Sequence, residues 1–283
     1  MNDTTCQEPA RPFFLDAAPG RRFCLYHAPD ASRECAGAIL YVHPFGDEMN
    51  MSRHMAAMQA RAFAAMGLGV LQIDLHGCGD SDGELRDASW EIWRQDLAVA
   101  ARWLETHVAP AVSLWGLRLG ATLAVDFARH AGSAIDTLIL WQPVIAGKAF
   151  MTQFLRLRVA GDMLNEHRDS TGGTQALRTA LASGDVVEVA GYELSPALVS
   201  GIDDMDLSCL SAMRAPIHWL EIVSGADGRM ADWRMDTARA WMANDIALHM
   251  HAVTCEPFWT GQEIRECLPL LSATTDILAE ATV

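Results

Sequence analysis

Lysine, regularly spaced cysteines and long apolar runs are scarce or missing in this sequence. Lys148 is the only lysine among 21 basic residues, and no run of 18 apolar residues occurs. A membrane-spanning helix needs about 20 predominantly apolar residues, so we expect no membrane span. The stretch 1–12 carries acidic residues and no apolar centre, which is unlike a secretory signal.

The seven cysteines show neither a metal-binding nor a redox spacing. No two of them form a CxxC pair, and their number is odd. Scattered cysteines are typical of reduced thiols in the cytoplasm. We therefore expect a cytoplasmic protein without a disulfide framework or a zinc site.

Motifs that bind nucleotides or catalytic metals are also absent. The sequence contains no phosphate-binding P-loop, no GxGxxG and no HExxH, so we expect neither a cofactor nor a metal. The formal charge of −15 leaves no basic field that would attract nucleic acid or an anionic membrane. We expect a small-molecule ligand, and the oligomeric state is left open.

Apolar runs alternate with amphipathic segments along most of the chain. The run 37–42 is apolar without a break, as in a strand that is buried on both faces. In a following segment Trp90, Trp93, Leu97 and Leu104 recur at helical spacing. This alternation predicts a mostly parallel sheet with helices on both faces. The predicted strands are short ones within 13–30, then 37–42, 69–74, 111–115, 137–141, 217–223 and about 247–253.

The segment 147–205 interrupts this alternation. It contains several charges, a Thr-Gly-Gly-Thr stretch and only a weak strand pattern at 186–189. We interpret it as an inserted, mostly helical lid. The predicted organisation is a core of residues 13–146 and 206–283 with a lid of residues 147–205.

Three loops that follow predicted strands resemble those of the α/β-hydrolase superfamily. Asp74-x-His76-Gly77-x-Gly79-x-Ser81 is similar to the D-x-R-G-x-G-x-S loop of these enzymes, with His76 in place of Arg. His43-Pro44-Phe45-Gly46 resembles the loop that supplies one oxyanion-hole N–H, and Gly116-x-Arg118-x-Gly120 stands where the nucleophile elbow is expected. The resemblance spans about residues 13–280. It implies an α/β-hydrolase fold with a mostly parallel eight-stranded sheet, flanking helices and a helical lid.

Five shorter segments resemble the exosortase A system-associated hydrolase type 2 family. They are residues 115–120, 141–144, 154–158, 190–195 and 257–259. This resemblance implies a bacterial cytoplasmic protein that is encoded with exopolysaccharide and protein-sorting genes. It implies no established substrate.

The catalytic triad that the resemblance to α/β hydrolases implies is degenerate. The elbow carries Arg118, whose guanidinium stays protonated at neutral pH and cannot attack a carbonyl group. Asp227 fills the acid position, and the loop after the last strand carries Glu256 where a histidine is expected. His251 in the preceding strand stays open as an alternative base. The nearest hydroxyl groups lie at the wrong positions, within the strand and one turn into the helix: Ser113 and Thr122.

Two interpretations of Arg118 remain open. It is expected at a helix N-terminus among the backbone N–H groups of Leu119 and the Phe45 region, a setting that suits a carboxylate, phosphate or sulfate. Alternatively, it forms an internal ion pair with Glu256 or Asp227 that closes a dead site. Both interpretations predict a carboxylate beside Arg118 in the empty protein.

Residues of the neighbouring loops also have two interpretations each. His43 and His76 are either a relocated base or structural histidines. Cys78 is either a relocated nucleophile or an inert buried thiol. Ser81 is expected to hydrogen-bond within its own loop.

Trp141 and Trp259 end strands at the rim of the predicted pocket, and they form either an apolar or sugar-binding wall or part of the core. The candidate catalytic residues are Arg118, Asp227 and Glu256. The candidate oxyanion and pocket residues are His43, Phe45, Leu119, His76, Ser81 and Trp141.

Two functions are compatible with these residues. The first is a hydrolase of esters or thioesters that uses an altered site, as the resemblance implies. The second is a catalytically silent protein that binds an anionic or acyl metabolite, or a protein partner, in exopolysaccharide production. The fold favours the first function, and Arg118 favours the second.

Overall fold

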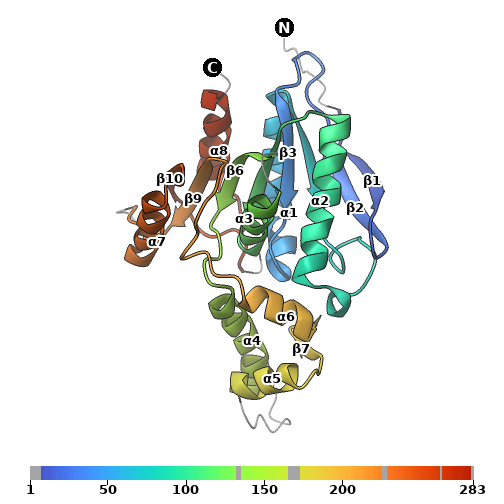
Figure 1. The fold of residues 1–283 in the computed structure, drawn as a ribbon, viewed down its shortest axis with the longest axis vertical. Helices are drawn as coiled ribbons and strands as arrows, with labels where there is room; N and C mark the ends of the chain where they lie inside the picture. Colours follow the sequence, from blue (N-terminus) through green and yellow to red (C-terminus); the bar gives the residue numbers. More distant parts are fainter. Residues whose placement is uncertain (1–7, 132–134, 165–172, 225–227, 262, 282–283) are drawn as a thin grey trace.

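Eight strands form one sheet in the order β1-β2-β4-β3-β5-β6-β9-β10 (Figure 1). The computed structural model describes residues 8–131, 135–164, 173–224, 228–261 and 263–281. β2 is antiparallel to β1 and to β4, and the other neighbouring strands are parallel. This confirms the predicted mostly parallel, eight-stranded sheet. The strands are β1 (Arg11–Asp16), β2 (Arg21–His27), β3 (Gly37–Val42), β4 (Leu68–Ile73), β5 (Val112–Leu117), β6 (Ile135–Trp141), β9 (Ile217–Val223) and β10 (Leu248–Thr254).

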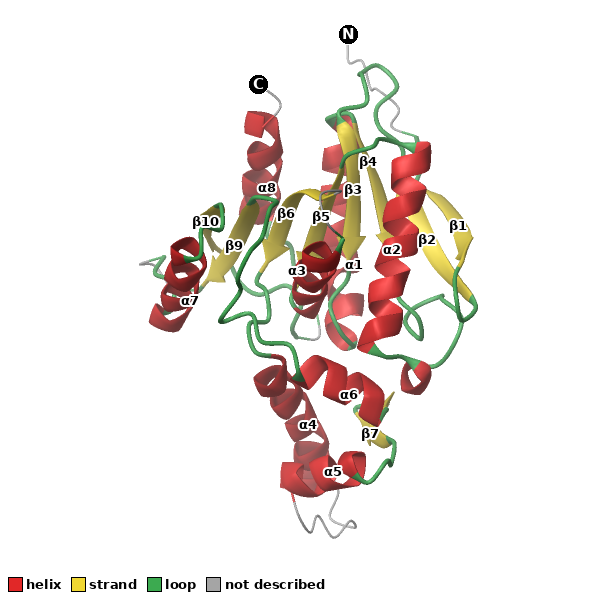
Figure 2. Ribbon diagram, in the orientation of Figure 1, coloured by secondary structure: helices red, strands yellow, loops and turns green. Residues whose placement is uncertain are grey.

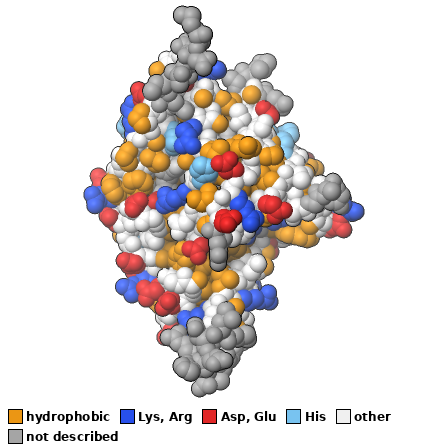
Figure 3. All heavy atoms as spheres, turned by 180° about the vertical axis from the view of Figure 1, so that it is seen from behind, with side chains coloured by type: hydrophobic (Ala, Val, Ile, Leu, Met, Phe, Trp, Pro, Cys, Tyr) orange, Lys and Arg blue, Asp and Glu red, His pale blue; other side chains and the backbone are white. Residues whose placement is uncertain are grey.

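Helices cover both faces of the sheet, so β3 and β5 are buried along their whole length (Figure 2). α1 (Asp47–Ala65) and α8 (Leu268–Ala281) pack on one face. α2 (Trp90–His107), α3 (Leu119–His130) and α7 (Asp232–Ala243) pack on the other, and a short 3-10 helix, Leu85–Asp87, precedes α2. Side chains of both charge signs are interspersed with apolar ones on the face that Figure 3 presents.

The segment between β6 and β9 lies beyond the carboxyl ends of the strands (Figures 1 and 2). It consists of α4 (Gly147–Leu164), α5 (Gly173–Ala182), the antiparallel hairpin of β7 (Val187–Val189) and β8 (Tyr192–Leu194), and α6 (Pro196–Asp203). Ser195 caps α6 by accepting a hydrogen bond from the Leu198 N–H, and Pro196 occupies the first turn of that helix.

Two cysteines form a disulfide, which corrects the expectation of reduced thiols alone. Cys255 follows β10 and Cys267 precedes α8, and their Cα atoms lie 6.0 Å apart. The two cysteines are 12 positions apart in the sequence, and they lie side by side because the chain turns back between β10 and α8. Among the described residues, no helix is both long and apolar enough to cross a bilayer.

A buried ion pair fastens the antiparallel edge of the sheet to α2. Arg22 Nε donates to Asp96 Oδ1 at 2.6 Å, and the His76 backbone N–H donates to Asp96 Oδ2 at 2.8 Å. Both charged side chains are at most 1% exposed. Burial raises the pKa of Asp96 to about 6, against the opposing effect of the His76 hydrogen bond and Arg22.

Truncation of Asp96 is expected to destabilise the fold strongly. Asp96→Ala leaves Arg22 as an unpaired buried charge, so the free energy of unfolding should fall by about 3–5 kcal/mol. Urea unfolding followed by circular dichroism measures this change. Glu105→Ala on the exposed side of the same helix is the control and should change stability by about 0.5 kcal/mol or less. Equal effects of the two substitutions would contradict the assignment of this pair.

Candidate functional site

The turn from β5 into α3 has the backbone of a nucleophile elbow. Arg118 adopts φ 56° and ψ −119°, a conformation that costs a non-glycine residue about 1–3 kcal/mol. A Cβ on Gly116 would lie 2.5 Å from the Cα of Ala121. A Cβ on Gly120 would lie 2.3 Å from the carbonyl oxygens of Val42 and His43. Both glycines are therefore required for the close approach of α3 to the sheet.

Hydrogen bonds from the neighbouring strand hold this strained turn. The Arg118 N–H donates to the Trp141 carbonyl at 2.9 Å, and the Arg118 carbonyl accepts from the Val144 N–H at 3.3 Å. Thr122 Oγ1 donates to the Val144 carbonyl at 2.6 Å. The hydroxyl of Thr122 is thus fully buried and engaged, and Ser113 lies within β5.

The Arg118 side chain lies at the elbow between an acid and two aromatic rings. Its Nε donates to Glu48 Oε1 at 3.2 Å, and each of the two side chains is 18% exposed. The guanidinium carbon lies 5.5 Å from the ring centre of Trp259 and 6.0 Å from that of Phe150. No described residue accepts a hydrogen bond from Nη1 or Nη2 of Arg118.

Glu48 is the carboxylate that both interpretations of Arg118 required, although it is neither of the two acids that we expected there. It lies in the first turn of α1, directly after the His43–Gly46 loop. Burial raises its pKa, while Arg118 acts in the opposite direction. Glu48 Oε2 is buried and has no hydrogen-bond partner among the described residues.

A cavity of about 370 Å³ opens at this pair and has a largely aromatic wall. Phe45 lies 5.0 Å from Phe154 and 6.0 Å from Phe150 between ring centres, so α4 supplies one side of the wall. The residues that line the cavity are Phe45, Asp47, Glu48, Met51, Arg118, Phe150, Gln153, Phe154, Leu157, Trp259, Thr260 and Gly261. We refer to this cavity as the elbow pocket.

The backbone donors expected for an oxyanion hole lie close to this pocket. α3 begins at Leu119, whose N–H has no acceptor within the helix. Phe45 and Leu119 border the same internal space of about 10 Å³, which is about the size of one water molecule. The two loops that carry these N–H groups therefore meet in the structure.

The described residues around Arg118 do not form a triad. Glu256 is exposed and does not line the pocket, and Trp259 from the same loop lies over the guanidinium instead. His251 lies on β10, where its Nε2 is 3.3 Å from Nδ1 of His218, and it does not line the pocket. Asp227 lies outside the described residues. The described lining contains no serine, cysteine or histidine.

The two loop histidines have buried, structural surroundings. His43 Nδ1 lies 2.7 Å from the Pro44 carbonyl, and Nε2 accepts from the Leu75 N–H at 3.2 Å. Burial lowers the pKa of His43 and of His76. The His76 ring packs directly on Gly83, where an added Cβ would lie 2.2 Å from it.

The remaining candidates are also held in structural roles. Burial raises the pKa of Cys78 to about 12, so the thiolate needed for nucleophilic attack is not formed at neutral pH. Ser81 Oγ donates to the Asp74 carbonyl at 2.5 Å and accepts from the Phe23 N–H at 2.9 Å. Trp141 is 1% exposed and donates to Thr274 Oγ1, so it belongs to the core.

Glu48, Phe150 and Phe154 were not among the site residues predicted from the sequence, although Phe154 begins the family-like segment 154–158. Glu48 had one available signal, its position directly after the loop that resembles an oxyanion loop. The two phenylalanines belong to the inserted helix α4, and nothing in their spacing distinguishes a pocket wall from a core.

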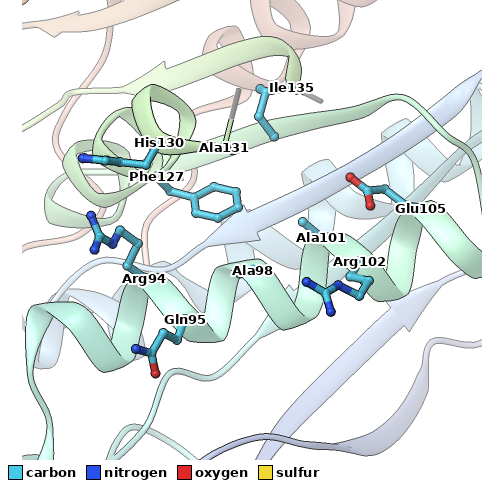
Figure 4. Close-up of a pocket in the computed structure, with 10 residues that line it drawn as sticks. All are labelled: Arg94, Gln95, Ala98, Ala101, Arg102, Glu105, Phe127, His130, Ala131 and Ile135. Carbon is cyan, nitrogen blue, oxygen red and sulfur yellow. The ribbon is translucent and has the colours of Figure 1, made fainter. Parts of the chain in front are cut away.

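A second hollow of about 370 Å³ lies between α2 and α3 (Figure 4). Ala98, Ala101 and Phe127 line it, with Arg94, Arg102 and His130 at its edge. None of the residues predicted for the site borders it, and the strained elbow does not face it. The elbow pocket is therefore the candidate functional site.

Comparison with known proteins places this geometry in a family. Among solved structures, the chain matches Est1E from Butyrivibrio proteoclasticus with a TM-score of 0.65 and 15% identity, over 95% of this chain and 98% of that chain. Proline iminopeptidase from Mycobacterium smegmatis gives a TM-score of 0.64 and 14% identity, over 96% and 99% of the two chains. A thioesterase domain from the curacin biosynthetic pathway gives a TM-score of 0.57 and 15% identity, over 97% and 99% of the two chains.

These likenesses show an α/β-hydrolase fold. A sequence search among curated proteins found no significant match. The profile of the family described as "Serine aminopeptidase, S33" matches residues 33–203, which is more than half of the chain. The chain therefore belongs to this serine aminopeptidase S33 family of α/β hydrolases.

Proposed function

We propose that the elbow pocket binds an acyl compound with an anionic head group, and that it forms no covalent acyl-enzyme. The observation that carries this proposal is the guanidinium of Arg118, which lines the pocket and whose Nη1 and Nη2 have no acceptor among the described residues. The head group pairs with these two nitrogens, and the apolar body lies along the aromatic wall.

The physical chemistry of the pocket supports an anion with an apolar body. Two parallel N–H donors of Arg match the two oxygens of a carboxylate, and charge-assisted hydrogen bonds of this kind are among the strong ones. The N-terminus of α3 adds a positive partial charge at the same place. A cavity of about 370 Å³ lies within the usual range for small ligands, roughly 300–1,000 Å³.

The described site lacks an activated nucleophile, which is the first requirement for covalent acyl transfer. A guanidinium is not a nucleophile, because it stays protonated at neutral pH. Nucleophilic catalysis needs a hydroxyl or thiol within hydrogen-bond reach of a base. The described lining offers Thr260 as its one hydroxyl and no histidine to activate it.

Hydrolysis by directly activated water is the second candidate function. The meeting of the Phe45 and Leu119 loops favours it, since those N–H groups would stabilise an oxyanion. Glu48, in place of the predicted Glu256, would then take a proton from the attacking water. This route would keep an ester or thioester hydrolase without any nucleophile at the elbow.

We further propose that the protein acts in the cytoplasm, in exopolysaccharide production linked to the exosortase A system, with residues 147–205 as the lid of the pocket. The resemblance of five sequence segments to the type 2 hydrolases of that system supports this proposal. The contacts of Phe150 and Phe154 with Phe45 support the lid assignment, because they join α4 to the core at the pocket.

Removal of the Arg118 charge is expected to abolish tight binding. Decanoate, and ferulic acid because Est1E was solved with it bound, serve as test ligands in isothermal titration calorimetry. Arg118→Gln should weaken binding about 10- to 100-fold, the value of one to two charge-assisted contacts.

Arg94→Gln is the matched control for this titration. Arg94 borders the hollow between α2 and α3, so this substitution should leave affinity unchanged. Urea unfolding checks that both variants are folded. Loss of affinity in the control alone would place the ligand in the other hollow and overturn the proposal.

Wild-type protein is expected to show no covalent acyl transfer. Incubation with p-nitrophenyl esters and acyl-CoA thioesters of varied chain length should give rates equal to buffer, and intact-mass spectrometry should detect no acyl adduct. An acyl adduct would contradict the proposal. Turnover without an adduct that is lost in Glu48→Gln would establish the second candidate function.

The cytoplasmic assignment makes a separate prediction for the disulfide. Disulfides are rare in the reducing cytoplasm, so Cys255 and Cys267 should be largely reduced in living cells and form their bond on isolation. Acid quenching of cells, alkylation of free thiols and mass spectrometry measure this ratio. A fully oxidised pair in quenched cells would contradict a cytoplasmic location.

A further inference from the structure

The elbow pocket holds more negative than positive charge next to the cation that is proposed to bind the ligand. Asp47 and Glu48 both line it, against Arg118 alone. An anionic ligand at Arg118 is therefore placed beside Glu48, which already occupies Nε of the same guanidinium. This arrangement restricts which anions the pocket accepts.

The charged groups in this part of the protein belong to several elements, and most of them form ion pairs with each other. Arg53 pairs with Asp74 at 3.1 Å, and Arg234 pairs with Glu221 at 3.0 Å. Arg118 is then the cation among these groups that remains available to a ligand. Arg118 acts directly on the Glu48 carboxyl, the Glu221–Arg234 pair of β9 and α7 interacts electrostatically with Arg118, and Tyr192 of β8 donates to the neighbouring Asp47.

The Asp47 carboxylate has a hydrogen-bond donor, whereas one oxygen of Glu48 has none among the described residues. Tyr192 Oη donates to Asp47 Oδ1 at 2.7 Å, so the lid holds that carboxylate. Glu48 Oε2 is buried without a partner among the described residues, although buried polar atoms are normally hydrogen-bonded. A ligand group that hydrogen-bonds this oxygen would satisfy it.

We propose that the head group selected by this pocket is a single carboxyl group, which is held by Arg118 and shares one proton with Glu48. This inference rests on the proposed binding function and names its ligand class, a monocarboxylic acid with an apolar body. Two carboxyl groups at hydrogen-bond distance do not both stay ionised, so one proton is taken up from solvent when the acid binds as its anion. The proton then lies between Glu48 Oε2 and a carboxylate oxygen of the ligand.

The same arrangement discriminates against a phosphate monoester. At neutral pH such a group carries close to two negative charges. It would leave a second negative charge next to Glu48 and Asp47, and like charges repel at this distance. Burial raises the pKa of Glu48 even before a ligand is present, which is consistent with proton uptake on binding.

Calorimetry with wild-type protein tests this inference directly. Decanoate, decyl phosphate and decanol are titrated in buffers of different ionisation enthalpy, which reports the number of protons taken up. We expect decanoate to bind with uptake of close to one proton and at least tenfold more tightly than decyl phosphate or decanol. Above neutral pH its affinity should fall by up to about tenfold per pH unit, since each binding event then requires a proton from solvent.

Glu48→Gln supplies an amide N–H at the same place without a titrating proton. Its decanoate binding should become independent of pH and proceed without proton uptake, while Glu105→Gln behaves as wild type. Decanoate binding without proton uptake, or equal affinity for decyl phosphate, would overturn the inference and leave the proposed function standing. Absence of binding by all three probes would overturn both.

Discussion

The close approach of α3 to strands β3 and β5 is the constraint on which the site depends. It requires glycine at 116 and 120, because a Cβ at either position would overlap backbone atoms. The turn between these glycines is forced to positive φ at Arg118, and it projects that side chain into the pocket. The strain persists because the surrounding hydrogen bonds over-determine the turn.

A buried polar network around the loop after β6 supplies part of that support. Gln142 follows β6 at φ 47°, and its amide joins Glu221 at 2.8 Å and the Ile222 N–H at 2.6 Å. Arg234 of α7 donates to the Pro143 carbonyl at 2.7 Å. These bonds fix the loop that carries Val144, which in turn holds the elbow. Such buried charges are tolerated because each one has a partner.

A cation at the elbow changes the electrostatics of the whole pocket. A hydrolase of this fold needs a neutral hydroxyl or thiol there, activated by a histidine. Here Arg118 pairs with Glu48 of α1, and Trp259 of the loop after β10 lies over the guanidinium. The pocket keeps its aromatic wall and the N-terminus of α3, and a cation beside them suits an amphipathic anion.

The sequence by itself determined the alternation of strands and helices, the mostly parallel sheet and the position of Arg118 at the elbow. An uninterrupted apolar run such as 37–42 predicts a buried strand, and two glycines that flank one residue predict a tight turn. Both predictions depend on neighbouring residues alone. Only the tertiary structure decided which acid pairs with Arg118. Glu48 is 70 residues away along the chain, and the charge of Glu256 alone does not reveal that it faces solvent. The same holds for Trp141, Trp259 and the Cys255–Cys267 bond, because side-chain burial and proximity depend on how distant segments pack.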